Sequence, residues 1–147
     1  MSPFSTDSKN LAAVKACFAR GDAGRLDLFD LFSDDFQFYF PKFGIGRGKA
    51  QFSDFIDGLM RKVKVLIHDV DAMQFFEGKN FVVAEGITRG IFHDGESWLG
   101  GRTPGGRFCS VYEFGGDGLI NRMHVYLDPD YTGQDACRFL WGADRKW

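Results

Sequence analysis

The N-terminal third of the chain repeats its apolar residues with a helical period. Leu11, Val14 and Phe18 are spaced three and four residues apart, which predicts a first helix. Residues 23–32 repeat this pattern and predict a second helix, and the stretch after Gly48 predicts a third. The apolar stripe of the third helix consists of Phe52, Phe55, Ile56, Leu59 and Val63.

Between the second and third helices the helical period gives way to strict alternation. Residues 36–40 read "FQFYF", with phenylalanine at every second position and Gln37 and Tyr39 between them. This alternation predicts a strand with one buried face. The glycine-rich residues 44–48 that follow lack the full dinucleotide-binding fingerprint, so they predict a tight turn rather than a phosphate loop.

From residue 65 onward the pattern is that of β-strands separated by turns. The predicted strands cover residues 65–76, 81–92, 107–114 and 119–127, and a glycine-rich loop covers 93–105. Three helices with one strand among them, followed by an antiparallel meander, predict an α+β domain with helices on one face of a sheet. We expect the whole chain, residues 1–147, to form this single domain.

Composition and charge narrow the functional classes. The net charge is −2 with no basic block, which argues against a nucleic-acid partner, and no apolar run is long enough to span a membrane. The N-terminus lacks a signal pattern, and Cys17, Cys109 and Cys137 are odd in number and widely spaced. We therefore expect a cytoplasmic protein without a disulfide framework, metal or cofactor.

Four phrases carry a resemblance to a known family. They are "LFSDDFQFYFP", "GRGKAQFSDFI", "TPGGRFCSVYEF" and "GDGLINRMHVYLD", and their order covers nearly the whole chain. Together they resemble the SnoaL-like polyketide cyclase group of the nuclear transport factor 2-like superfamily. The resemblance implies a cystatin-like cone, in which three N-terminal helices pack on a curved, mainly antiparallel sheet. It also implies an apolar pocket inside the cone and a homodimer formed through the outer face of the sheet.

The resemblance does not extend to the catalytic residues of two related enzyme classes. Where ketosteroid isomerases of this superfamily carry their catalytic aspartate, this sequence has Phe40, and their oxyanion pair corresponds to Val14 and Ser110. The arginine and aspartate of limonene epoxide hydrolase-like members correspond to Gly86 and Thr88. Because one fold hosts many activities, the resemblance implies a fold and a pocket, and it does not imply a reaction.

Strand alternation predicts which side chains line the pocket. The face of each strand that carries the apolar residues should point toward the helices. Small residues of the third strand, Val82, Ala84, Gly86 and Thr88, should leave space there. The predicted wall consists of Phe38, Phe40, Ser110, Tyr112, Met123 and Val125.

The same alternation places His124 and Ile120 on the outer face of the last strand. His124 could act as a base beside Asp128, but a polar cross-strand cluster with Arg122 and Glu113 is the favoured interpretation.

His68 and Asp71 are the candidate proton-transfer residues. A histidine at a position similar to that of His68 acts in scytalone dehydratase-like members. The two residues differ in parity, so a regular strand cannot direct both inward. A two-residue turn at Gly78 and Lys79 would place Asp71 inside and His68 outside, whereas a bulge or a longer turn would reverse this, and a solvated strand entrance is the alternative.

Trp98, in the loop 93–105, has two open interpretations. Its ring could close over a bound ligand, or it could pack against the edge of the sheet.

The sequence leaves two functional hypotheses. The first is an enzyme that acts by metal-free proton transfer on a small hydrophobic or polycyclic molecule, as a lyase or isomerase, with Tyr112 and Ser110 orienting a carbonyl. The second is a noncatalytic ligand-binding or dimerisation module of the same fold. A titratable group with a shifted pKa inside the pocket would favour the enzyme.

Overall fold

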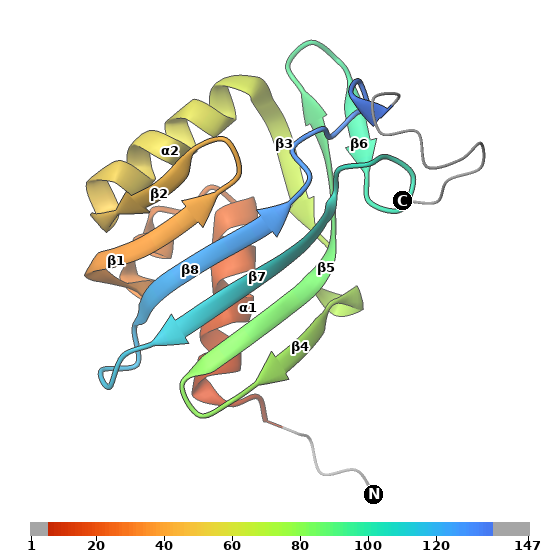
Figure 1. The fold of residues 1–147 in the computed structure, drawn as a ribbon. Helices are drawn as coiled ribbons and strands as arrows, with labels where there is room; N and C mark the ends of the chain where they lie inside the picture. The colour runs from red at the N-terminus through yellow and green to blue at the C-terminus, as the bar shows by residue number, and fades with distance from the viewer. Residues whose placement is uncertain (1–5, 137–147) are drawn as a thin grey trace, which may run out of the picture.

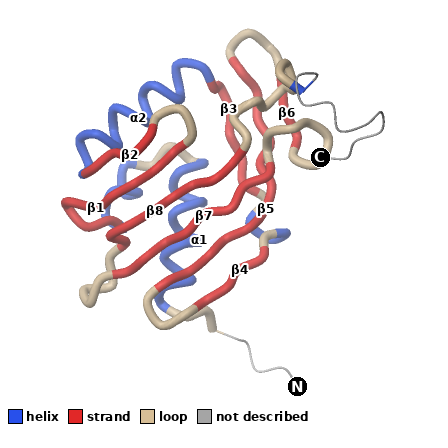
Figure 2. The backbone as a smooth tube through the Cα atoms, viewed as in Figure 1, coloured by secondary structure: helices blue, strands red, loops and turns tan. Residues whose placement is uncertain are grey.

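An eight-stranded sheet runs through the molecule, and helices α1 and α2 lie against one of its faces (Figures 1 and 2). The computed structural model describes residues 6–136. In chain order, the helices are α1 (Lys9–Asp22), the 3₁₀ helix η1 (Leu26–Leu31), α2 (Gly48–Lys62) and the 3₁₀ helix η2 (Val70–Ala72). The strands are β1 (Phe32–Phe40), β2 (Gly44–Arg47), β3 (Val63–His68), β4 (Gln74–Glu77), β5 (Phe81–Phe92), β6 (Ser97–Leu99), β7 (Arg107–Phe114) and β8 (Ile120–Leu127).

The strand order is β2-β1-β8-β7-β5-β3, with β4 and β6 also pairing to β5. β1 and β8 pair in parallel, whereas the remaining neighbours are antiparallel. The sheet curves around the helices, as Figure 1 shows. The α+β class and the curved, mainly antiparallel sheet predicted from the sequence are thereby confirmed.

The second predicted helix is shorter and tighter than expected. It is the 3₁₀ helix η1, which ends at Leu31, and Phe32 already belongs to β1. Gly24 has a φ of 65° directly after α1, a conformation that stops an α-helix and suits glycine. The short segment that remains before β1 forms only 3₁₀ turns.

The stretch predicted as a tight turn at 44–48 contains strand β2 instead. β2 pairs antiparallel with β1, and Phe38 is opposite Gly46. A Cβ atom on Gly46 would lie only 2.2 Å from Cζ of Phe38, so the glycine makes room for that ring. Glycine therefore serves ring packing at this position, although its sequence signal resembles that of a turn.

The strand predicted over residues 65–76 is broken into β3 and β4. His68 is opposite Thr88 and Gln74 is opposite Glu85, so residues 69–73 form a bulge that includes η2. Met73 is buried in this bulge, and a Cβ atom on Gly86 would lie 2.6 Å from its Cγ atom. Met73 therefore fills the space beside Gly86 on β5, which corrects the expectation that Gly86 leaves open space.

The core is an assembly of phenylalanine rings between β1 and α2. Phe32, Phe36 and Phe38 are completely buried, and Phe52 of α2 is nearly so. The Phe52 ring packs edge-on against Phe36 with 5.3 Å between centroids and against Phe38 with 5.1 Å. β1 therefore has one buried face, as the alternation of its residues predicts, and that face supplies these rings.

The side chains of β8 that face the helices are largely those that the alternation predicts, with one exception at the start of the strand. Met123 is buried, but so is Ile120, which alternation had placed outside. The pairing of β7 with β8 shifts register between Glu113 and Phe114, and this irregularity rotates Ile120 into the core.

Helices α1 and α2 are short and amphipathic. α1 has 14 residues and α2 has 15, and each buries only some of its residues. Within residues 6–136, no helix is both long and apolar enough to cross a membrane.

Candidate functional site

A cavity of about 280 Å³ lies between the inner face of the sheet and the helices α1, η1 and α2. Most of its lining side chains are apolar. Two groups of polar side chains line it, His68 with Asp22 and Tyr112 with Ser110 and Cys17. Its further polar lining residues are Arg20, Arg25, Ser53, Asp57 and Thr88. An apolar cavity with a few convergent polar groups is the usual form of a small-molecule site.

The first polar group is a histidine–aspartate pair. His68 Nδ1 lies 2.6 Å from Asp22 Oδ1, and the backbone N–H of His68 donates to Asp22 Oδ2 at 2.7 Å. Both side chains are 19% exposed. A carboxylate only accepts hydrogen bonds, so Nδ1 carries a proton, and in a neutral imidazole the lone pair is then on Nε2.

Local structure explains why these two residues meet. Asp22 is the last residue of α1 and His68 is the last residue of β3, and these ends lie side by side. Phe18, one turn earlier on α1, packs on the His68 ring with 4.7 Å between centroids, and Phe108 packs edge-on at 5.3 Å. The imidazole is thus held in one orientation by two rings and a carboxylate.

The structure reverses the placement of His68 and Asp71 that a two-residue turn would give. His68 is opposite Thr88, an inward residue of β5, and lines the cavity. Asp71 lies in η2 and is exposed to solvent. The physical cause is the bulge at 69–73, because the β4–β5 hairpin, in which Glu77 pairs with Val82, keeps the side chains of β4 on the faces that the two-residue turn would give.

The second polar group is a chain of neutral side chains on the cavity wall. The Tyr112 hydroxyl is hydrogen-bonded to the side chains of Cys17 and Ser110. Burial raises the pKa of the Cys17 thiol to about 12 and also raises the pKa of the Tyr112 phenol. Both groups therefore remain protonated near neutral pH and offer hydrogen-bond donors rather than charges.

Five of the predicted wall residues line the cavity. They are Phe40, Ser110, Tyr112, Met123 and Val125. Phe38 does not line it, because its ring is completely buried between Gly46 and the rings of Phe52 and Phe55. A ligand-binding role for the five residues stays a prediction.

Trp98 packs against the sheet and does not close over the cavity. It is 3% exposed, its Nε1 donates to Thr88 Oγ1 at 3.0 Å, and its ring fills the space above Gly90. The Trp98 ring also contacts Tyr131, with 4.7 Å between centroids. Of the two interpretations of Trp98, the structure has the packed one.

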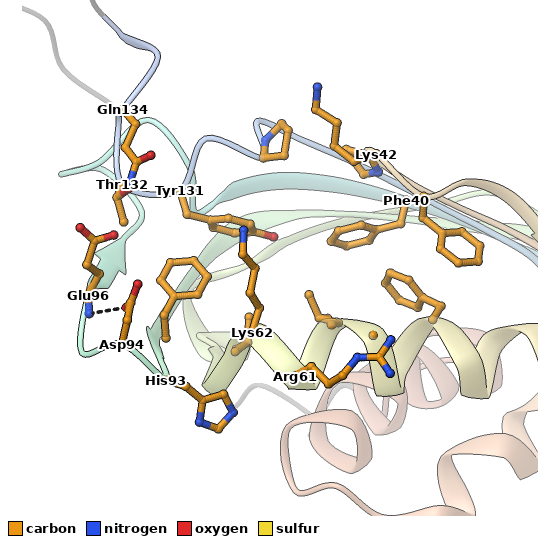
Figure 3. A pocket seen from close by; sticks show the side chains of 18 of the residues that line it. Phe40, Lys42, Arg61, Lys62, His93, Asp94, Glu96, Tyr131, Thr132 and Gln134 are labelled. Carbon is orange, nitrogen blue, oxygen red and sulfur yellow. Dashed lines mark hydrogen bonds between the residues drawn. The ribbon is translucent and has the colours of Figure 1, made fainter.

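A larger and more open groove of about 770 Å³ adjoins the cavity (Figure 3). Four residues line both, namely Phe40, Phe55, Leu59 and Tyr131. We regard the smaller cavity as the candidate active site because it holds the His68–Asp22 pair, and the groove as its approach.

His124 lies outside the cavity, on the opposite face of the sheet. Arg122 Nη2 lies 3.1 Å from His124 Nδ1, and Arg122 also pairs with Glu113 at 3.3 Å. The predicted polar cross-strand cluster is therefore confirmed. Burial, followed by the charge of Arg122, lowers the pKa of His124.

Asp22 is the candidate functional residue that the sequence patterns did not indicate. It reads as a helix-terminating polar residue after Gly21, and its partner is 46 residues away. A carboxylate at the C-terminal end of a helix opposes the helix dipole. That unfavourable position was the only sequence signal that Asp22 serves another purpose.

Comparisons with known proteins agree with this architecture. A family model described as a SnoaL-like domain matches residues 11–123. No curated protein sequence matches the chain. Similar solved structures include a nuclear transport factor 2-like protein of unknown function from Burkholderia pseudomallei K96243, with 16% identity and a TM-score of 0.73 over 92% of this chain and 100% of that one.

Two further structures are similar over most of their length. A candidate polyketide cyclase from Xanthomonas campestris has 15% identity and a TM-score of 0.71, covering 82% of this chain and 90% of that one. TerC, co-crystallised with polyporic acid, has 18% identity and a TM-score of 0.69, covering 82% of this chain and 92% of that one. Similarity at these identities establishes the fold.

Proposed function

Because the chain belongs to the family of SnoaL-like domains, we propose that it binds a small apolar molecule in the cavity and moves a proton on that molecule. The observation that carries this proposal is the His68–Asp22 pair inside the apolar cavity. The reaction class would be that of a lyase or isomerase. A structural neighbour, TerC, was co-crystallised with polyporic acid, which supports a ligand-binding role for this fold.

His68 is the proposed general base and acid. Asp22 holds the proton on Nδ1, which leaves the lone pair of Nε2 for a proton of the ligand. Within residues 6–136, no side chain hydrogen-bonds to Nε2, and the Phe18 and Phe108 rings pack against the imidazole. Asp22 then stabilises the imidazolium that forms, as a carboxylate does beside a catalytic histidine.

Tyr112 and Ser110 are the proposed carbonyl-orienting groups. Both are almost fully buried on the cavity wall, and their hydroxyls are linked to each other. Neutral donors in a site from which water is excluded stabilise an oxygen on which negative charge develops. A ketone held there would have its neighbouring C–H proton removed by His68.

The cavity volume limits the ligand. An engineered cavity of about 150 Å³ accommodates benzene, so a cavity of about 280 Å³ suits a ligand of roughly one or two rings. We therefore narrow the sequence-based expectation of a polycyclic molecule to a ligand whose buried part is mono- or bicyclic.

Isotope exchange tests the proposed proton transfer without knowledge of the natural substrate. The protein is incubated in D₂O with 2-tetralone, a bicyclic ketone, and loss of the α-proton signals is followed by NMR. We expect protein-catalysed exchange that falls about a hundredfold or more in His68→Gln, in line with general-base contributions. Asp22→Asn should also reduce exchange, because the imidazole tautomer is no longer fixed.

His124→Gln, on the outer face of the sheet, is the matched control and should exchange at the wild-type rate. Binding of 2-tetralone by each variant, measured by calorimetry, separates a lost base from a lost fold. If wild type binds the ketone and His68→Gln exchanges it equally fast, the acid–base role is contradicted and the binding-module hypothesis is favoured.

A further inference from the structure

Tyr131 lies at the junction between the cavity and the groove. It follows β8 in the segment after Pro129 and lines both spaces. Figure 3 shows its hydroxyl directed inward along the groove, toward Phe40. A ligand that extends from the cavity into the groove beside Tyr131 would therefore meet this hydroxyl.

The Tyr131 ring is fixed by its neighbours. Trp98 packs on it with 4.7 Å between centroids, and Phe92 packs edge-on at 5.9 Å. Its backbone lies so close to Gly105 that a Cβ atom there would be 2.4 Å from Tyr131 Cα. Because ring and backbone are both held, the position of the hydroxyl is set before any ligand binds.

The Tyr131 hydroxyl is not used in packing the described part of the chain. Within residues 6–136, no group hydrogen-bonds to it, although the ring is largely enclosed. Burial raises the pKa of Tyr131 to about 12, so the hydroxyl is neutral near pH 7 and can donate its proton in a hydrogen bond. A half-buried polar group normally finds a partner, and this one faces the space in which a ligand would lie.

Lys62 supplies positive charge from the other side of the groove. It is at the end of α2, and Figure 3 shows its side chain rising from that helix toward the side on which Tyr131 lies. Among the described residues, no acid forms an ion pair with Lys62. The acidic side chains of the β5–β6 loop lie farther out, and Asp94 Oδ1 accepts from the backbone N–H of Glu96 at 2.9 Å.

We propose that Tyr131 and Lys62 form a binding site for a carboxylate at the outer end of the ligand. The ligand class is then a one- or two-ring apolar molecule that carries a carboxylate on the end remote from His68. The inference rests on the proposed function, since it takes the ring body to lie in the cavity. In this arrangement both groups donate hydrogen bonds, so they select a ligand group that accepts them. The positive charge of Lys62 favours an acceptor with negative charge.

Three matched probes test this site. They are 2-naphthoate, 2-naphthamide and naphthalene, which share the ring body and differ in the outer group. Dissociation constants are measured by calorimetry for wild type, Tyr131→Phe and Lys62→Gln. Tyr131→Phe keeps the ring that packs on Trp98 and removes only the hydroxyl. Tyr126→Phe, on the outer face, and Lys79→Gln, in the β4–β5 turn, are the matched controls.

We expect 2-naphthoate to bind wild type about tenfold or more tightly than naphthalene, which is the usual effect of a hydrogen bond to a charged group. Tyr131→Phe should weaken both 2-naphthoate and 2-naphthamide. Lys62→Gln should weaken 2-naphthoate alone and reduce its dependence on salt. Naphthalene affinity and both control variants should be unchanged.

Equal affinity of all three probes for wild type would overturn the carboxylate site while leaving the proposed function standing. Undiminished 2-naphthoate binding by the Tyr131→Phe, Lys62→Gln double variant would also overturn it. Failure of every probe to bind would instead overturn the proposed function, and this inference with it.

Discussion

His68 of β3 lies on the inner face of the sheet and His124 of β8 on the outer face. The two side chains differ in the groups that contact their ring nitrogens. His68 Nδ1 contacts Asp22, and its Nε2 has no hydrogen-bond partner within residues 6–136. His124 has both nitrogens occupied, since Nε2 lies 2.9 Å from Gln37 Oε1 and Nδ1 lies 3.1 Å from Arg122 Nη2. At the scale of single residues, this difference is why the proposed proton transfer is assigned to His68 and not to His124.

The environment of His124 makes stability depend on pH. Its pKa is lowered in the folded protein from an ordinary value of 6.5, first by burial and then by Arg122, with Glu113 opposing. The unfolded chain therefore binds more protons as the pH falls through 6.5 toward the lowered value, and stability is lost in that window. We expect His124→Gln to flatten the dependence of unfolding free energy on pH between about 5 and 7.

Urea unfolding at pH 5, 6, 7 and 8 measures this slope. His93→Gln serves as the control, because His93 is exposed and should leave the slope as in wild type. An equally steep slope in His124→Gln would assign the pH dependence to other groups.

At the scale of elements, two positions in the sheet carry glycine because an aromatic ring occupies the space that a larger side chain would need. Gly46 on β2 lies under Phe38, and Gly90 on β5 lies under Trp98. In both cases a Cβ atom would overlap a ring that is itself immobilised by its neighbours. The strands and the aromatic core therefore constrain each other, and neither can be altered independently.

Gly46→Ala should destabilise the protein by about 1–3 kcal/mol, the usual cost of overpacking a filled core. The new Cβ atom would lie 2.2 Å from Phe38 Cζ, and Phe38 is completely buried, so the ring cannot move away freely. Gly116→Ala, in the β7–β8 turn with nothing within 4 Å, is the control and should change stability little. A Gly46→Ala midpoint in urea equal to that of wild type would contradict this account.

Sequence patterns predicted the elements that depend on neighbours close in the chain. β5 and β7 have the predicted bounds, because alternation and turn residues act locally. The bulge at 69–73 depends on how β3 and β4 pair with β5, which no local pattern reports. The His68–Asp22 contact follows from that register and from a helix end 46 residues away, so it required the tertiary structure.

At the scale of the whole molecule, the outer face of the sheet is a candidate interface. We propose that the protein forms a homodimer through this face. Tyr126 is 47% exposed and Phe81 is 43% exposed there, and Val111 lies between them, partly exposed, on β7. Exposed apolar and aromatic side chains on one face of a sheet favour association when charged groups surround them.

Val111→Glu should convert this dimer to a monomer, because the introduced charges would face each other across the interface. Light scattering after size-exclusion chromatography gives the mass. Leu26→Glu, which alters a residue 85% exposed on the helical side, should keep the wild-type mass. A monomeric wild-type protein would contradict the proposed interface.

The bulge at 69–73 also separates two parts of one edge of the sheet. His68 pairs with Thr88 on one side of it, and Gln74 pairs with Glu85 on the other. A residue gained or lost inside the bulge can be absorbed there, so the β4–β5 hairpin can change length or be exchanged for another without turning His68 away from Asp22. A deletion within β3 itself would rotate the imidazole to the opposite face. The hairpin is therefore the part of this fold that can diversify while the histidine keeps its orientation.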